Sequence, residues 1–98
     1  MANSETSVQV TLLVSKVFVP QENKTMVIVF CPELDTEGFG ASREEAEKNL
    51  RENLKINVIM AKAQGFLNDK LLSLGWTEGK GGKFTPPEIT VEKVSVTL

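Results

Sequence analysis

The sequence has no histidine and no tyrosine, and it has one cysteine, Cys31. Histidine is the commonest general base and the commonest metal ligand, so the usual residue for acid–base and metal chemistry is missing. A Ser–His–Asp arrangement is therefore excluded within one chain, and Cys31 has no histidine to activate it as a nucleophile. A lone cysteine also excludes an intramolecular disulfide. We predict that the chain is not an enzyme and carries no cofactor, and that Cys31 is a small buried side chain.

Three further features are absent. The formal net charge of −2 lacks the basic excess of nucleic-acid-binding proteins, so neither DNA nor RNA is an expected partner. No apolar run is long enough to span a bilayer. The first residues, "MANSETS", have neither the basic region nor the apolar segment of a signal peptide. We therefore expect a cytoplasmic protein that does not enter a membrane.

The composition is that of one globular domain. The chain has 98 residues, of which 41% are apolar and 24% are charged, enough to close a single core. We expect residues 1–7 to be a disordered N-terminus and residues 8–98 to form a single α+β domain.

The first half predicts three strands. Apolar residues alternate from Val8 to Val14, and their phase then changes, which predicts a strand with a bulge near Ser15 or Lys16. Pro20 ends this strand, and "QENK" is typical of a hairpin connection. "TMVIVFC" is apolar on both faces, as in a central strand, and Pro32 ends it. In "DTEGFGA" we expect a third strand whose two glycines adopt special backbone conformations.

Helical signals follow the third strand. Ser42 and Glu45 form the S-x-x-E pattern of a capping box. An apolar stripe then recurs at helical spacing up to Gly65: Ala46, Leu50, Leu54, Val58 and Ala61. We expect Asn68 to cap a short second helix that ends at Leu74, before Gly75.

The last part of the chain predicts a turn and a strand. "TEGKGGK" lacks the P-loop pattern and favours a glycine-rich turn. "EITVEKVSVTL" predicts a final strand over residues 88–98. The fold predicted from the whole chain is α+β, in the order β-β-β-α-(α)-β, with helices on one face of a small antiparallel sheet.

Three carboxylates, Glu33, Asp35 and Glu37, alternate in front of the helix. An extended backbone would place all three on one face, as the solvated side of an edge strand, a docking strip for a partner, or a metal site. The solvated side is favoured, because charge on an edge strand discourages aggregation, and the docking strip comes next. The metal site comes last, because the EF-hand spacing is missing. Trp76 is either a second partner contact or, since no other aromatic accompanies it, a lid over the core.

The stretch "PELDTEGFGASREEA" resembles the signature of HicB-like antitoxin domains. "LLSLGW", "KFTPP" and "VEKVSV" are also similar to a variant subfamily, so the resemblance covers most of residues 8–98. The matching residues are Pro32, Glu33, Leu34, Asp35, Gly38, Phe39, Gly40, Ser42, Glu44, Glu45 and Ala46.

The resemblance implies a β-β-β-α-β domain, related to the double-stranded-RNA-binding-domain fold, that binds and silences a small ribonuclease toxin. The family often adds a DNA-binding domain, but only one strand's length follows Pro87 here. The predicted function is a non-catalytic protein-binding module whose partner is a small basic toxin. Two alternatives remain open: a small metal-dependent nuclease that uses Glu33, Asp35 and Glu37, and a structural homodimer without a toxin partner.

The predicted last strand also indicates self-association. Val94, Val96 and Leu98 share one face up to the last residue of the chain. An apolar strand left at a sheet edge is an aggregation hazard, so it has to pair with its own sheet or with a second copy. We expect a homodimer with these three residues at its interface.

Overall fold

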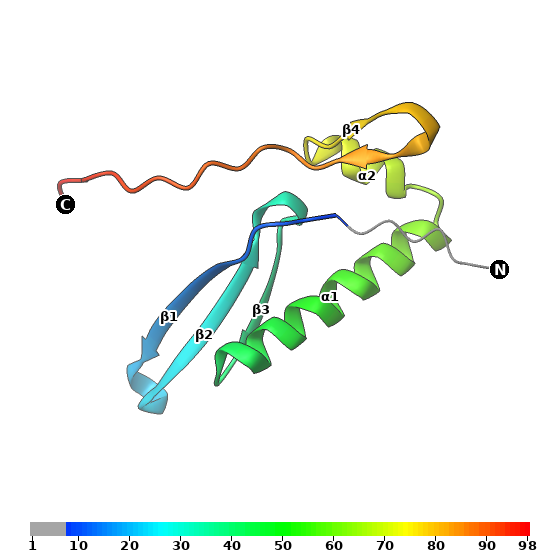
Figure 1. The fold of residues 1–98 in the computed structure, drawn as a ribbon. Helices are drawn as coiled ribbons and strands as arrows, with labels where there is room; N and C mark the ends of the chain where they lie inside the picture. Colours follow the sequence, from blue (N-terminus) through cyan, green and yellow to red (C-terminus); the bar gives the residue numbers. More distant parts are fainter. Residues whose placement is uncertain (1–7) are drawn as a thin grey trace.

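The computed structural model describes residues 8–98, and the disorder predicted for residues 1–7 lies outside that range (Figure 1). The strands are β1 (Leu13–Val19), β2 (Lys24–Cys31), β3 (Thr36–Gly40), β4 (Thr77–Glu78) and β5 (Phe84–Thr85). The helices are α1 (Arg43–Ala63) and α2 (Leu67–Ser73), and short 3-10 turns span Pro20–Glu22, Pro32–Leu34 and Lys80–Gly82. The α+β prediction is confirmed.

The sheet is antiparallel in the order β1-β2-β3, and α1 lies across one of its faces (Figure 1). Pro20 and Pro32 end β1 and β2 as predicted. Each proline directly follows the last residue of its strand and begins a 3-10 turn. A two-stranded β4–β5 hairpin follows α2. The predicted glycine-rich turn is confirmed, since it connects the two strands of that hairpin.

The core lies between β2 and α1. Val27, Val29 and Cys31 alternate along β2 and are buried, together with Ala46 and Leu50 of α1. The side chains between them point to the other face, which α1 does not cover. Strand pairing adds residues of β1 and β3 to that face. The apolar side chains of this open face are Leu13, Val17, Val19, Met26, Ile28, Phe30 and Phe39, and its polar ones are Ser15, Lys24 and Glu37.

Gly38 and Gly40 serve close packing, which corrects the prediction of special backbone conformations. Neither glycine has a positive φ. A Cβ at Gly38 would overlap the backbone of Ala46 and lie 2.8 Å from Leu50 Cα. At Gly40, a Cβ would lie 2.6 Å from the Ala46 nitrogen. Glycine is therefore required because α1 rests directly on β3.

The helix start is confirmed at Ser42. Its hydroxyl oxygen accepts a hydrogen bond from the Glu45 backbone N–H at 3.2 Å, so Ser42 is the N-cap residue. Replacing Ser42 with alanine is expected to lower the free energy of unfolding by about 1 kcal/mol, because that amide loses its partner. A urea melt measures this change. An unaltered midpoint would show that Ser42 contributes nothing to the helix end.

The first strand differs from its prediction. β1 begins at Leu13 and pairs residue for residue with β2, so the bulge predicted near Ser15 or Lys16 is wrong. The change of phase has another cause. Val10 and Leu12 precede the strand and pack against the core cluster, whereas β1 itself forms the sheet edge.

The second helix begins earlier than predicted. Phe66 occupies the N-cap position of α2 without a side-chain bond, so the Asn68 cap is wrong. Gly75, with a φ of +92°, ends the region as predicted. The Gly75 N–H donates to Leu72 O at 3.1 Å and the Trp76 N–H donates to Leu71 O at 3.0 Å. These two hydrogen bonds form a Schellman motif, which fixes the position of Trp76.

The last strand of the prediction is not formed in the described chain. β5 ends at Thr85, and residues 86–98 are extended without a strand partner. These residues leave the hairpin and run to the left, above the three-stranded sheet in this view, to the end of the chain (Figure 1). We call residues 88–98 the C-terminal segment. Its apolar residues are largely exposed, with Val94 at 76% and Val96 at 72%.

Candidate functional site

The three predicted carboxylates do not form one strip. Glu33 lies in the 3-10 turn Pro32–Leu34 and is buried, with 4% of its surface exposed. Asp35 follows in a left-handed conformation, with φ at 46°, and is exposed. Glu37 is exposed on β3 and pairs with Phe30, on the open face. The single acidic face is wrong because the backbone is not extended between the first and second carboxylates.

Glu33 holds the N-terminal segment in place. Its Oε2 accepts hydrogen bonds from both the Thr11 backbone N–H and the Thr11 hydroxyl, each at 2.8 Å. The Cys31 thiol lies 3.8 Å from Oε1. All three partners are donors, which satisfies a buried carboxylate. The carboxylate is therefore engaged within the fold and presents no surface to a partner.

Trp76 is a core residue rather than a contact surface. Its side chain is 5% exposed, and its indole Nε1–H donates to the Glu33 backbone oxygen at 2.8 Å. This bond joins the region after α2 to the turn between β2 and β3, across 43 positions of sequence. The lid interpretation of Trp76 fits this placement, and its predicted role as a partner contact does not.

The two turns of the sheet have the same construction, which the sequence reasoning missed. "VPQEN" and "CPELD" each place proline at the start of a 3-10 turn and end it at a left-handed residue, Asn23 or Asp35. Asparagine and aspartate tolerate this conformation better than other non-glycine residues. The repeated proline followed three residues later by Asn or Asp is the signal that could have revealed it. Asp35 is therefore explained by turn geometry.

Cys31 is confirmed as a small buried side chain. Burial raises the pKa of its thiol, the opposite of what a nucleophilic cysteine needs.

A pKa that is higher in the folded state stabilises the fold only while the thiol stays protonated. This contribution is complete below the pKa of the unfolded thiol, about 8.5, and is lost as the pH rises through the folded value. We expect the free energy of unfolding to fall in alkaline solution, and the native thiol to resist a thiol reagent at pH 8. Equal labelling of native and urea-unfolded protein would contradict this.

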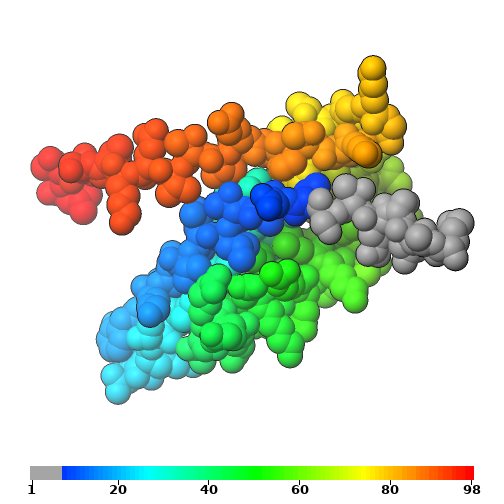
Figure 2. All heavy atoms as spheres, in the orientation of Figure 1, coloured from blue at the N-terminus to red at the C-terminus, as the bar shows by residue number. Residues whose placement is uncertain are grey.

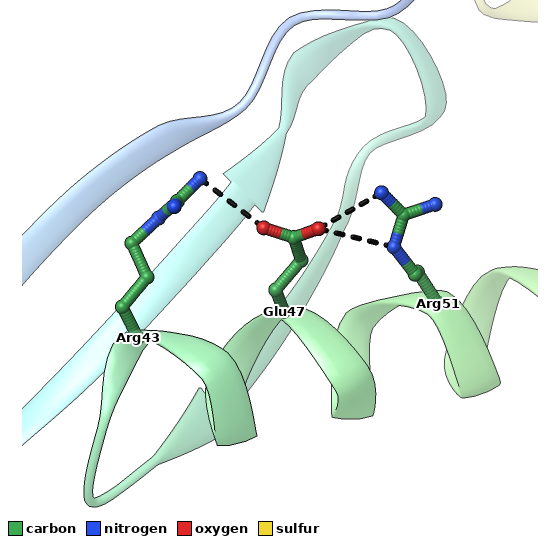
Figure 3. Close-up of polar contacts among 3 residues, drawn as sticks. All are labelled: Arg43, Glu47 and Arg51. Carbon is green, nitrogen blue, oxygen red and sulfur yellow. Dashed lines mark hydrogen bonds and ion pairs between the residues drawn. The ribbon is translucent and has the colours of Figure 1, made fainter.

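The exposed side of α1 carries a row of charges. Glu47 bonds Arg43 at 3.1 Å, one turn before it, and Arg51 at 2.8 Å, one turn after it (Figure 3). The hydrogen bond from Arg51 is the main reason that the pKa of Glu47 is lowered. Exposed pairs of this kind contribute little to stability, so the row is a solvated helix face.

Reactive groups do not gather in the part of the chain that the structure describes. Over residues 8–98, no three His, Cys, Asp or Glu side chains are grouped so as to hold a metal ion. The described helices include none with the length and hydropathy needed to cross a bilayer. The features left available to a partner are the open face of the sheet, the outer edge of β1 and the C-terminal segment.

Comparisons with protein-family models, with curated proteins and with solved structures returned no match. The resemblance to HicB-like antitoxins therefore remains a prediction from the motif residues. Several of these residues now have structural explanations, including the two glycines under α1, the Ser42 cap and the Glu33 bonds.

Proposed function

We propose that this chain is a non-catalytic, cytoplasmic protein-binding module of the HicB-like antitoxin kind. The observation that carries the proposal is the open face of the sheet, where apolar side chains lie without a covering layer. Val17 is 43% exposed and Phe39 is 45% exposed on this face. Domains normally bury both faces of an apolar sheet or keep the second face polar, so an apolar second face favours a protein partner.

The surroundings of the open face also favour binding over catalysis. Its neighbouring carboxylate is Glu37, while Glu33 is occupied by Thr11. A lone exposed carboxylate can contact a basic partner at the rim of an apolar patch, which is the usual arrangement of protein interfaces. The resemblance makes a small basic ribonuclease toxin the first partner to test.

The test is a calorimetric titration of the chain with the small basic protein encoded by the neighbouring reading frame. We expect saturable binding, weakened at least tenfold by Phe39→Asp, because a charge would replace an exposed apolar contact of the open face. Ile59→Asp is the matched control, since Ile59 is 54% exposed on α1, away from the open face. No binding, or equal loss in the two variants, would contradict the proposal.

The nuclease alternative is tested with the remaining exposed carboxylates. We expect no turnover of RNA or DNA with magnesium or manganese. Turnover by the purified chain that disappears in an Asp35→Ala, Glu37→Ala double variant would replace the binding module with an enzyme. Glu33 is left intact in this test because its loss would disturb the fold.

A further inference from the structure

The two edge strands of the three-stranded sheet, β1 and β3, differ in whether side chains cover their outer backbone groups. At β3, the Asn49 side chain donates to the Phe39 backbone oxygen at 2.6 Å, and the Asn53 side chain donates to the Glu37 backbone oxygen at 3.0 Å. Both asparagines project from α1, so the helix closes this edge to an added strand. Covering an edge in this way prevents strand addition.

The β1 edge has no such cover. Among the described residues, no side chain donates a hydrogen bond to the β1 backbone. Its apolar side chains are exposed on both faces: Val14 and Phe18 on the α1 side are 44% and 57% exposed, and Val17 on the open face is 43% exposed. An uncapped edge flanked by exposed apolar side chains is a template for another strand.

The C-terminal segment has the properties of the missing strand. It is extended, has no strand partner and is rich in β-branched residues. Its last residues project beyond the rest of the molecule as a thin arm (Figure 2). Eleven extended residues span about 36 Å, more than enough to follow the seven residues of β1.

One antiparallel register matches the two segments. Placing Lys16 opposite Glu92 pairs opposite charges, and the same register sets Val14 opposite Val94 and Val17 opposite Val91. β1 and the C-terminal segment each change apolar phase across this central charged residue, so the two irregular patterns become complementary. The register continues to Val19 opposite Ile89. Apolar and opposite-charge pairs directly across two strands are the stabilising ones.

Within one chain, the direction is wrong for this register. β1 and the C-terminal segment both run from the right to the left of the molecule in Figure 1, so a chain's own segment would meet β1 in a parallel sense. Antiparallel pairing therefore calls for a segment that arrives from a second copy.

We propose that the C-terminal segment of each copy pairs antiparallel with β1 of a second copy, with Lys16 opposite the second copy's Glu92. This reciprocal exchange uses the same surface on both subunits and closes after two, so it yields a dimer rather than a fibre. It extends each three-stranded sheet to four strands. The inference rests on the sheet edges and is independent of the proposed toxin partner.

Cysteine cross-linking tests both the register and the exchange. The variant carries Val14→Cys and Val94→Cys, whose Cα atoms would lie within disulfide range as directly opposed residues. Mild oxidation is expected to give a covalent dimer on a non-reducing gel. The control, Val17→Cys with Val94→Cys, is three residues out of register and should stay largely uncross-linked. An oxidised monomer in the first variant, or equal cross-linking of both variants, overturns the proposal.

A charge exchange supplies a second test that does not depend on cysteines. Lys16 and Glu92 are both exposed in the single chain, so substitution leaves the core intact. Lys16→Glu and Glu92→Lys are each expected to raise the dimer dissociation constant about tenfold, because two like-charge pairs form per dimer. The double variant is expected to recover the original value. Additive weakening in the double variant overturns the register.

Discussion

Replacing Gly38 with alanine is expected to lower the free energy of unfolding by about 3 kcal/mol, the upper end of the usual cost of overpacking. The added Cβ would overlap the α1 backbone at Ala46 and lie 2.8 Å from Leu50 Cα. Backbone atoms cannot rotate away as a flexible side chain does, so α1 has to lift from β3. Lifting it also opens the core around Leu50 and Val29, both essentially buried.

Gly79→Ala is the matched control for this substitution. A Cβ at Gly79 would lie 3.6 Å from the Lys83 backbone oxygen, an ordinary contact. Urea melts should give different free energies of unfolding for the two variants. The value for Gly79→Ala should lie within about 0.5 kcal/mol of the parent, as is usual for a surface change. If both glycines tolerated alanine equally, the close approach of α1 to β3 would be wrong.

Replacing Glu33 with alanine is expected to cost about 3 kcal/mol of unfolding free energy. The backbone N–H and the hydroxyl of Thr11 would both lose a charged acceptor, and each such bond contributes roughly 1.5–3 kcal/mol. We expect the segment before β1 to detach as well, since Thr11 lies between two residues that pack on the core, Val10 and Leu12.

Glu37→Ala is the control for Glu33, because it removes an exposed carboxylate from the same stretch. Urea melts are expected to show a change of less than about 0.5 kcal/mol for Glu37→Ala. Glu33→Gln keeps one acceptor oxygen, so its loss of unfolding free energy is expected to lie between those of Glu33→Ala and Glu37→Ala. Equal midpoints for Glu33→Ala and Glu37→Ala would show that the buried bonds do not stabilise the fold.

The parts of the fold that sequence predicted well depend on neighbouring residues. Pro20 and Pro32 end strands because proline lacks a backbone donor, and Ser42 caps α1 through an amide three residues away. Gly75 ends the α2 region in the same local manner. Each of these signals acts on residues within about one turn of it, so the local sequence is enough to predict its effect.

The parts that sequence missed depend on distant residues. The burial of Glu33 results from Thr11, which lies 22 positions away, and the fixing of Trp76 depends on a bond to Glu33 across 43 positions. From their spacing in the sequence, Glu33 could not be distinguished from the two exposed carboxylates, Asp35 and Glu37. The role of Gly38 was equally hidden, because a glycine required by an approaching helix looks the same in sequence as one required by a turn.

The prediction for residues 88–98 concerns a strand that a single chain does not complete. The structure forms no strand over these residues, and the described chain offers them no antiparallel partner. The expected interface residues Val94, Val96 and Leu98 are exposed in one copy. A second copy would supply the missing edge, so the homodimer remains the prediction on which the account depends.

Light scattering of the full chain over a range of concentrations tests that claim most directly. The mass of one chain is 10.8 kDa. The account predicts a mass of about twice this value, returning to that of one chain when a stop codon follows Pro87, because the whole C-terminal segment is removed. A full-length chain that stays at 10.8 kDa throughout, or a shortened chain that stays dimeric, would contradict it.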